Sequence, residues 1–336
     1  MQRVDNTERV TKACACANVA LVKYWGKRDP EANLPAVGSI SLTLEGLEAE
    51  ATISMRPADR FTSRGKTVPG RAYDQMVSFL DWVARTYDSE TPLAVNIETN
   101  FPVAAGLASS AAIYCATATA ALSFLEVSAS RRELSAIARR GSGSASRSVF
   151  GGLVEWHRGT DPGGDDSFAD PLLPAEDWAL GMVVAILDEG QKKTSSRDAM
   201  QHVAETSPLY SGWLAAQEDD LESMRHAIHA RDFPTVGRIT EESTLRMHAV
   251  TMAARPAVLY WQPATLHVME AVRELRATGL DAYFTMDAGP QVKVLCQQQD
   301  MGAVAAKLES VPAVLRVLQA RAGSGVRVLE GKAPWK

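Results

Sequence analysis

The hydrophobic periodicity of this chain changes repeatedly along its length, and no other feature of the sequence constrains the fold as strongly. Residues 10–22, 39–47 and 49–55 alternate small or apolar side chains with others, which is typical of β-strands. Residues 71–87 then carry apolar side chains at helical spacing, and residues 93–97 alternate again. The first part of the chain therefore predicts an antiparallel sheet combined with a helix.

The later segments continue this mixture. Further helices are predicted at residues 104–125, 131–140 and 263–278 and over most of 195–254, and further strands at residues 153–156, 178–187, 282–286 and 292–296. Residues 56–71, which are basic and contain glycine and proline, are predicted to be a solvated hairpin loop, and residues 158–170, which are rich in Gly and Asp, an exposed loop. The chain is therefore predicted to be an α+β protein with two domains, residues 1–185 and 186–336.

The charge balance restricts the partners of the chain. Of its 336 residues, 35 are Lys or Arg and 40 are Asp or Glu, which gives a formal net charge of −5. Because there are no blocks of Lys or Arg, the composition argues against nucleic acid or an anionic membrane as the main partner. No apolar run approaches the roughly 20 residues of a membrane span, and residues 1–10 lack the apolar core of a signal peptide, so a cytoplasmic location is expected. An anionic ligand would need a local cluster of cations.

Cysteine and histidine give no sign of a metal site. The four cysteines, Cys14, Cys16, Cys115 and Cys296, are too scattered for a disulfide framework, and the first two lack the spacing of a zinc half-site. Buried thiols are the simplest interpretation. The six histidines contain no HExxH-like pair, so no residue is assigned to a metal.

Two segments rich in glycine and serine have the composition of phosphate-binding sites. Residues 106–110, with the sequence GLASS, open the predicted helix at 104–125, where free N–H groups and the helix dipole attract phosphate oxygens. Residues 141–148, with the sequence GSGSASRS, lie between a helix and an apolar strand, and Arg147 adds a fork that matches a carboxylate or phosphate. A helix cap for the first segment and a flexible loop for the second are alternative interpretations.

Three further groups fit the same kind of ligand. Residues 23–28 (KYWGKR) place three cations and two aromatic rings directly after an apolar strand, and residues 192–197 (KKTSSR) form a second cationic, hydroxyl-rich segment. Asp287 precedes a Gly-Pro turn at a strand end, where it is either a turn former or a proton acceptor in a cationic cleft. A solvated surface is the alternative for both cationic segments. Together these groups predict a site for a multiply anionic small molecule.

Five of these segments occur in the order seen in one known family. The sequence resembles the mevalonate diphosphate decarboxylases of the GHMP kinase superfamily over nearly its whole length. The segments that carry the resemblance are ANVALVKYWGKRD (17–29), NFPVAAGLASSAA (100–112), ARRGSGSASRSVFGG (138–152), KKTSSRDAM (192–200) and MDAGP (286–290). The KYWGK and GSGSA-x-RS patterns separate this branch from the related kinases.

The resemblance implies both a fold and a reaction. The expected fold is the α+β GHMP kinase fold, in which a ribosomal protein S5-like N-terminal domain and a ferredoxin-like C-terminal domain flank a deep cleft. In the expected reaction, ATP with Mg²⁺ phosphorylates the tertiary 3-hydroxyl of mevalonate 5-diphosphate, and loss of that phosphate with carbon dioxide gives isopentenyl diphosphate. Related enzymes are often homodimers, so the resemblance also implies a homodimer.

The resemblance assigns roles to individual residues. It implies that the catalytic groups are Asp287 beside the 3-hydroxyl, Lys23 beside Asp287, and Arg147 at the substrate carboxylate. A carboxylate near a lysine stays ionised, which suits a base or a hydroxyl-orienting group. The groups implied to bind the substrate are Tyr24, Lys27, Ser142, Ser144, Arg147, Ser196 and Arg197. The groups implied to bind ATP are Gly106, Leu107, Ala108, Ser109 and Ser110.

Two departures from the family pattern bear on the substrate. Residues 36–38 are Ala-Val-Gly where the family usually has a polar run, and Asp198 places a negative charge beside the expected phosphate-binding groups. Decarboxylation of mevalonate 5-phosphate and 3-phosphorylation of mevalonate without decarboxylation are therefore alternative activities, and a non-catalytic binding protein is a third alternative. The diphosphate is favoured because the cations and serines expected around its phosphates remain.

Overall fold

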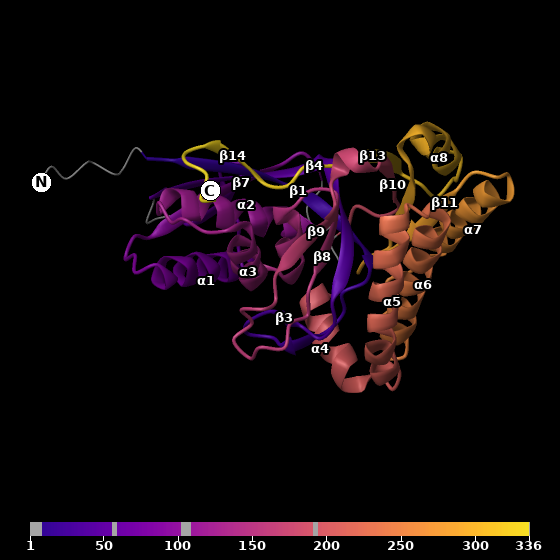
Figure 1. Cartoon of the computed structure of the whole chain (residues 1–336), viewed down its shortest axis with the longest axis horizontal. Coiled ribbons are helices and arrows are strands. Elements are labelled where there is room, and N and C mark those ends of the chain that lie inside the picture. The colour runs from indigo at the N-terminus through magenta and orange to yellow at the C-terminus, as the bar shows by residue number, and fades with distance from the viewer. Residues whose placement is uncertain (1–8, 56–58, 102–108, 191–193, 336) are drawn as a thin grey trace, which may run out of the picture.

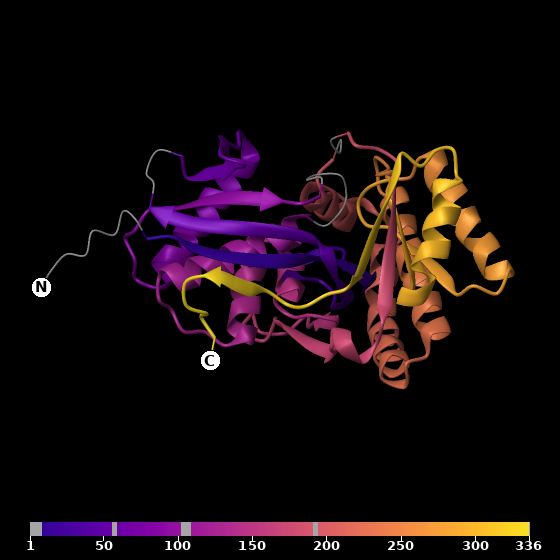
Figure 2. The ribbon, with the colours of Figure 1, turned by 90° about the horizontal axis from the view of Figure 1, so that it is seen from above.

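Strands and helices alternate along the chain, as the changing periodicity predicts (Figure 1). The computed structural model describes residues 9–55, 59–101, 109–190 and 194–335. Within this part, two halves lie side by side: the N-terminal half holds long strands with helices packed on them, and the C-terminal half holds the longer helices (Figures 1 and 2).

Most strands of the described residues join one mixed sheet. They are β1 (Thr11–Val22), β4 (Ser39–Met55), β5 (Phe61–Ser63), β6 (Lys66–Thr67), β7 (Leu93–Thr99), β8 (Leu153–Trp156), β9 (Ala169–Leu173), β10 (Leu180–Ile186), β11 (Ala282–Thr285), β12 (Val292–Gln297), β13 (Arg316–Ala322) and β14 (Arg327–Glu330). The main path of the sheet runs β11-β12-β10-β13-β4-β7-β5-β6, and β1 and β8 also pair with β4. A separate small sheet joins β2 (Lys27–Asp29) to β3 (Leu34–Pro35). Because β13 pairs with β4, the sheet is continuous between the two halves.

The predicted strands at 39–47 and 49–55 are one long strand, β4. The partner of Cys16 in β1 is Glu48, whereas the partner of the next residue, Ala17, is Leu44. The intervening residues of β4 bulge out of the ladder at Gly46, whose φ is 95°. A bulge interrupts the alternation of side chains without ending a strand, so the sequence pattern breaks where the strand does not.

Eight helices in the described residues cover the sheet or extend from it. They are α1 (Arg71–Thr86), α2 (Ser109–Phe124), α3 (Arg131–Gly141), α4 (Ser196–Thr206), α5 (Tyr210–Ala230), α6 (Phe233–Met252), α7 (Pro263–Ala277) and α8 (Met301–Glu309). Helix α2 packs against β1 and β4 and is buried over most of its surface, which its alanine-rich sequence allows because small side chains permit close approach. None of the described helices is long and apolar enough to cross a membrane.

The two halves are joined by more than the chain connection before α4. Strand β10 pairs with β12 and β13 in the C-terminal half. Strand β14, from the end of the chain, returns to pair with β1 (Figure 2). Helix α6 packs against both β1 and β11, so it connects a strand of the N-terminal half with a strand of the C-terminal half.

The structure differs from the sequence expectations in its short elements. Residues 143–149 form a 3₁₀ helix, η2 (Gly143–Val149), and most of its residues are buried, so the interpretation of this run as a flexible loop is wrong. The predicted loop at 158–170 contains the buried Ser167 and reaches the first residues of β9. Strands β13 and β14 and helix α8 had no predicted counterpart, because short, partly exposed elements carry little periodicity. All four cysteines are free and buried, as expected.

Candidate active site

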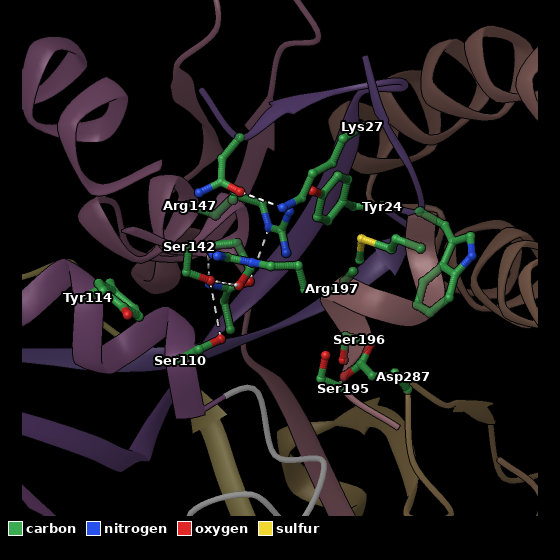
Figure 3. Close-up of a pocket in the computed structure, with 18 of the residues that line it drawn as sticks. Tyr24, Lys27, Ser110, Tyr114, Ser142, Arg147, Ser195, Ser196, Arg197 and Asp287 are labelled. Atoms are coloured by element: carbon green, nitrogen blue, oxygen red, sulfur yellow. Dashed lines mark hydrogen bonds between the residues drawn. The ribbon is translucent and has the colours of Figure 1, made fainter. Parts of the chain in front are cut away.

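One pocket of about 320 Å³ collects the residues predicted to form the site (Figure 3). The predicted residues that line it are Lys23, Tyr24, Lys27, Ser109, Ser110, Ser142, Ser144, Arg147, Ser196, Arg197 and Asp287. They come from both halves of the molecule, and the only acidic side chain among the described lining residues is Asp287. A chain with an acidic total charge therefore has a cationic pocket. Gly106, Leu107 and Ala108 lie outside the described residues.

Asp287 lies between two lysines at the back of this pocket. The Nζ of Lys23 donates to Oδ1 of Asp287 at 2.7 Å, and the Nζ of Lys293 donates to Oδ2 at 2.8 Å. Both lysine side chains are 1% exposed, whereas the carboxylate of Asp287 is 25% exposed. The geometry follows from the strands: Lys23 directly follows β1, Asp287 lies between β11 and β12, and Lys293 on β12 pairs with Thr285 on β11.

The two lysines keep the carboxylate ionised. Burial alone would raise the pKa of Asp287, but the charges and hydrogen bonds of Lys23 and Lys293 hold it well below its usual range. Burial lowers the pKa of Lys23 to about 8, against the attraction of Asp287. At neutral pH the group is therefore a carboxylate between ammonium groups.

Helix α6 supports this cluster from behind. The Oγ of Ser243 accepts a hydrogen bond from the backbone N–H of Lys23 at 2.9 Å. The hydroxyl of Thr244 bonds the backbone of Met286 twice, accepting from its N–H at 3.0 Å and donating to its carbonyl at 2.8 Å. These contacts fix the backbone on either side of the Lys23–Asp287 pair. Burial lowers the pKa of His248, on the same helix, to about 3, so its ring is neutral at ordinary pH.

Arg147 is held rigidly in η2. Its Nε donates to Oδ1 of Asn18 at 3.0 Å, and its Nη1 donates to Oγ of Ser39 at 2.7 Å. Asn18 also donates from Nδ2 to the carbonyl of Ser144 at 3.0 Å. Burial lowers the pKa of Arg147 to about 10, which leaves it charged at neutral pH. A buried guanidinium with a fixed plane suits a planar anion such as a carboxylate.

The glycines of the 141–148 run are explained by aromatic packing. A Cβ atom on Gly141 would lie 2.1 Å from the ring of Tyr114, and one on Gly143 would lie 2.7 Å from the ring of Trp156. Glycine is therefore required at both positions to let the backbone approach these rings. Packing against protein rings thus accounts for these two glycines.

Hydroxyl groups line one side of the pocket. The Oγ atoms of Ser110 and Ser142 are 3.2 Å apart, and those of Ser142 and Ser144 are 3.3 Å apart (Figure 3). This row links the start of α2 to η2. The Tyr24 hydroxyl is buried without a hydrogen-bond partner among the described residues, and burial raises its pKa. Such hydroxyls can donate to phosphate oxygens.

Two more cations face the hydroxyls. The Nζ of Lys27 donates to Oδ1 of Asn33 at 2.5 Å, and burial, helped by the charge of Arg197, lowers the pKa of Lys27 to about 8. The Nη2 of Arg197 donates to the carbonyl of Gly141 at 3.3 Å. Ser196 and Arg197 begin α4 and line the pocket, so the N-terminal end of this helix lies at the pocket.

Asp198 does not face the phosphate-binding groups as expected. Its carboxylate pairs with Arg71 of α1 at 2.8 Å and accepts a hydrogen bond from the hydroxyl of Ser195 at 2.6 Å. These contacts lower the pKa of Asp198. It is not among the lining residues of the pocket in the described chain. Its charge is therefore balanced by α1 instead of opposing a ligand.

The unusual residues 36–38 also lie outside the pocket lining. Val37 is 4% exposed and packs in a hydrophobic cluster with Trp25 and Met200. The backbone N–H of Ala36 donates to the carbonyl of Gly26 at 3.1 Å. Residues 36–38 therefore pack behind lining residues of the pocket and are not themselves among its described lining.

Three residues of the site were missed by the sequence analysis. Lys293 contacts Asp287, Asn18 orients Arg147, and Asn33 binds Lys27. Two of these residues carried a signal in the sequence: Lys293 lies in the apolar run VKVLC, and Asn18 lies in the apolar strand before Lys23. Because burying a polar group without a hydrogen-bond partner is costly, each of them indicates a buried polar partner. Asn33 carried no comparable signal.

Comparison with known proteins places the chain in a family. The model described as "Diphosphomevalonate decarboxylase-like N-terminal domain" matches residues 15–169, and the one described as "Mevalonate 5-diphosphate decarboxylase C-terminal domain" matches residues 182–324. The diphosphomevalonate decarboxylase of Candida albicans is 34% identical over 307 residues, which cover 86% of this chain and 85% of that relative. The chain belongs to the diphosphomevalonate decarboxylase family. The resemblance read from the sequence motifs is thus confirmed.

Solved structures of diphosphomevalonate decarboxylases share the fold. A structure described as MDDEF in complex with MVAPP, AMPPCP and magnesium is 40% identical, has a TM-score of 0.89 and covers 96% of this chain and 99% of that chain. The enzyme from Staphylococcus aureus is 35% identical, with a TM-score of 0.90 and coverage of 96% and 98%. The predicted α+β fold of the GHMP type is confirmed, and so is the prediction that the chain is a decarboxylase.

Proposed function

We propose that this chain uses ATP to convert mevalonate 5-diphosphate to isopentenyl diphosphate, ADP, phosphate and carbon dioxide, a step of isoprenoid synthesis by the mevalonate pathway. The observation that carries the proposal is Asp287, whose carboxylate reaches the pocket while Lys23 and Lys293 hold it at 2.7 and 2.8 Å. A related protein is described in complex with MVAPP, AMPPCP and magnesium, which supports these ligand classes for the present pocket.

Asp287 is suited to orient the tertiary 3-hydroxyl of the substrate. Its carboxylate stays ionised, so it can accept the hydroxyl's hydrogen bond and direct a lone pair of the oxygen toward the γ-phosphorus of ATP. The new oxygen–phosphorus bond forms as the bond between the γ-phosphorus and the bridging oxygen of ADP breaks, and the proton of the hydroxyl passes to the Asp287 carboxylate. Phosphoryl transfer needs mainly positioning and neutralisation of charge, which the cations of the pocket provide.

Arg147 is suited to bind the substrate carboxylate. Breaking the bond between this carboxylate and its neighbouring carbon releases carbon dioxide and an electron pair, which forms the double bond as the tertiary phosphate leaves. The phosphate takes the electrons of the broken carbon–oxygen bond, so no separate electron-accepting cofactor is required. Because Asn18 and Ser39 fix the guanidinium, the carboxylate would be held in one orientation during this step.

The remaining cations and hydroxyls form the proposed site for the 5-diphosphate. Lys27, from the N-terminal half, and Arg197, from α4, both supply positive charge. The N-terminus of α4 adds unpaired N–H groups. The residues proposed to contact the substrate are Tyr24, Lys27, Ser142, Ser144, Arg147, Ser196 and Arg197. Together they suit more negative charge than a single phosphate carries.

The nucleotide is proposed to bind at the start of α2. Ser109 and Ser110 line the pocket there, and the proposed contacts of residues 106–108 belong to the same segment. The described residues contain no group of three or more His, Cys, Asp or Glu that could hold a metal. The hydroxyls of Ser110 and Ser142 would instead suit a hard cation whose other ligands are mainly phosphate oxygens. Magnesium bound with ATP would neutralise phosphate charge at this position.

The proposal is tested by measuring all three products with each possible substrate. Purified protein with ATP and Mg²⁺ is given mevalonate, its 5-phosphate or its 5-diphosphate, and ADP, phosphate and carbon dioxide are quantified. Equal yields of the three products from the diphosphate alone are expected. Preference for the monophosphate, ADP without carbon dioxide, or no ADP at all would instead establish the monophosphate decarboxylase, the kinase or the non-catalytic binding protein.

Three organisational features are part of the same proposal. They are a division into domains at residues 1–185 and 186–336, a homodimer, and a cytoplasmic location. The first two are checked by limited proteolysis near residue 185 and by light scattering on a sizing column. A scattering mass equal to one chain of 36.2 kDa would contradict the homodimer.

A further inference from the structure

Lys293 is the most unusual residue of the pocket region. It is the second residue of β12, a strand whose other residues are mainly apolar and buried, and its side chain is 1% exposed. Its Nζ is 2.8 Å from Oδ2 of Asp287. Among the described residues that line the pocket, Lys23 and Asp287 appear but Lys293 does not. Lys293 therefore contacts Asp287 from the side away from the ligand.

The charge balance of Asp287 does not by itself require a second lysine. Removing an ammonium group from water is expensive, and one buried lysine is already enough to balance one carboxylate. An apolar side chain of similar volume would fill the same space at lower cost. A buried charge of this kind is retained where the charge itself is used, so its effect on Asp287 is the property to examine.

We propose that Lys293 is a positioning residue for the reaction, which keeps the Asp287 carboxylate ionised and fixes its orientation toward the substrate hydroxyl. Each carboxylate oxygen has its own lysine, so rotation about the side chain would break both contacts. The inference rests on the proposed role of Asp287. It adds the group that maintains this role without touching substrate.

The charged groups around Asp287 determine the pKa values of Asp287 and Lys23. Lys23 faces it from the end of β1, Lys293 from β12, Arg147 from η2 and His248 from α6. His248 is neutral across the range of an assay because burial lowers its pKa to about 3. Loss of the Lys293 charge would raise the pKa of Asp287 through loss of an attractive partner. It would also raise the pKa of Lys23, which Lys293 now lowers by repulsion.

The test replaces Lys293 with methionine, which has a similar length but no charge. At saturating ATP and diphosphate, kcat is expected to fall about 10- to 100-fold, while both KM values change less than about 3-fold because Lys293 does not line the pocket. The alkaline limb of the kcat profile against pH is expected to move upward by at least about half a pH unit, because removal of a like charge raises the pKa of Lys23. A loss of packing alone would lower kcat without moving this limb.

Three matched variants complete the design. Lys293→Gln keeps a hydrogen-bond donor without charge and is expected to share the shifted limb; it also carries the test where Lys293→Met does not fold. Lys293→Arg retains the charge and is expected to keep the alkaline limb of the unmodified enzyme. Lys307→Met removes a lysine that pairs with Glu274 at 2.6 Å on the surface and is expected to change neither quantity. A kcat equal to that of the unmodified enzyme, or an unmoved limb in both neutral variants, overturns the proposal.

Asp287→Asn, measured in parallel, separates this inference from the proposed function. An inactive Asp287→Asn with Lys293 variants of full activity would refute the inference alone. An active Asp287→Asn would refute the role of Asp287 itself, and with it the reason for Lys293.

Discussion

Most cations of the pocket are held by neutral acceptors. Lys27 is bound by the amide oxygen of Asn33, Arg147 by Asn18 and Ser39, and Arg197 by a backbone carbonyl. A neutral acceptor fixes the direction of a charged side chain without cancelling its charge. Burial then strengthens the field of that charge, since little water screens it. The pocket can therefore be rigid and strongly cationic at once, which is what a multiply charged anion requires.

Removal of the Arg197 guanidinium should weaken substrate binding selectively. In Arg197→Ala, the KM for mevalonate 5-diphosphate is expected to rise about 10- to 100-fold, because a hydrogen bond to a charged group contributes about 1.5 to 3 kcal/mol. The KM for ATP should change less than about 3-fold. Steady-state kinetics with each substrate varied in turn measures both values. Arg238→Ala, which removes an arginine paired with Glu242 on the surface, is the control.

Equal increases of the two KM values in Arg197→Ala would contradict the placement of this residue at the substrate.

The residues of the site differ in how far the sequence could predict them. Lys23 and Asp287 lie in recognisable motifs, although 264 positions separate them and only the fold brings them to 2.7 Å. Lys293 and Asn18 lie in apolar strands, where a single polar residue shows that a partner exists but not which one. Identifying the partner requires the strand pairing, since β12 meets β11 only in the folded sheet.

At the scale of elements, η2 positions two of the proposed substrate-binding residues. It carries Ser144 and Arg147 on a short 3₁₀ helix that begins against the ring of Trp156. The 3₁₀ helix tolerates no side chain at Gly143, because a Cβ there would lie 2.7 Å from that ring and 3.1 Å from the hydroxyl of Tyr24. A small change in this backbone would therefore move the guanidinium of Arg147.

Gly143→Ala should damage both stability and activity. We expect a loss of about 1 to 3 kcal/mol in the free energy of unfolding, which is typical of overpacking, and a fall in kcat/KM of at least about 10-fold as η2 shifts. Denaturant unfolding and steady-state kinetics measure the two effects. The matched control is Gly302→Ala in α8, where no atom lies within 4 Å of the new Cβ and alanine favours the helix. A Gly143→Ala enzyme with the properties of Gly302→Ala would refute the packing argument.

The pair between Arg71 and Asp198 links α1 to the first turn of α4. Both side chains are largely exposed, at 62% and 47%, so the pair should contribute little to global stability. Its effect should be on the ligand: in Arg71→Ala, the uncompensated carboxylate of Asp198 would raise the KM for the diphosphate by about 3- to 10-fold. The double variant Arg71→Ala/Asp198→Ala should return the KM to near its original value. A double variant no better than Arg71→Ala alone would show that Asp198 has no electrostatic influence on the site.

The predictability of the elements follows their length and burial. Helix α1 and strand β7 have regular spacing over many residues and were found at nearly their observed bounds. Strands β13 and β14 have mixed or exposed side chains, because their positions are set by pairing with β10, β4 and β1 instead of by an apolar face of their own. Local periodicity cannot report such pairing.

At the scale of the whole molecule, the end of the chain returns from the C-terminal half to the N-terminal half. Strand β13 joins the C-terminal half to β4, and β14 then pairs with β1. After β14, the backbone carbonyl of Pro334 accepts from the N–H of Ala129 at 2.7 Å, and the Trp335 ring lies 4.4 Å from the guanidinium carbon of Arg131. The pocket, lined by both halves, is thus built on one continuous sheet, which limits how far its two sides can separate.

The distribution of charge over the whole molecule leads to the last prediction. The chain carries a formal net charge of −5, yet four cations and one carboxylate, Asp287, line the described part of the pocket: Lys23, Lys27, Arg147 and Arg197. Mutual repulsion of these cations destabilises the ligand-free protein, so a polyanion that binds there should stabilise the fold. At about 100 times its Kd, inorganic pyrophosphate should add about 2.7 kcal/mol and raise Tm by about 4 °C. Differential scanning fluorimetry measures this shift.

Sulfate at equal ionic strength should produce a smaller shift in Tm. The variant Arg197→Ala should reduce the response to pyrophosphate, while Arg238→Ala should leave it unchanged. Equal shifts with both salts in all three proteins would mean that the anions act on the surface generally and not on the pocket.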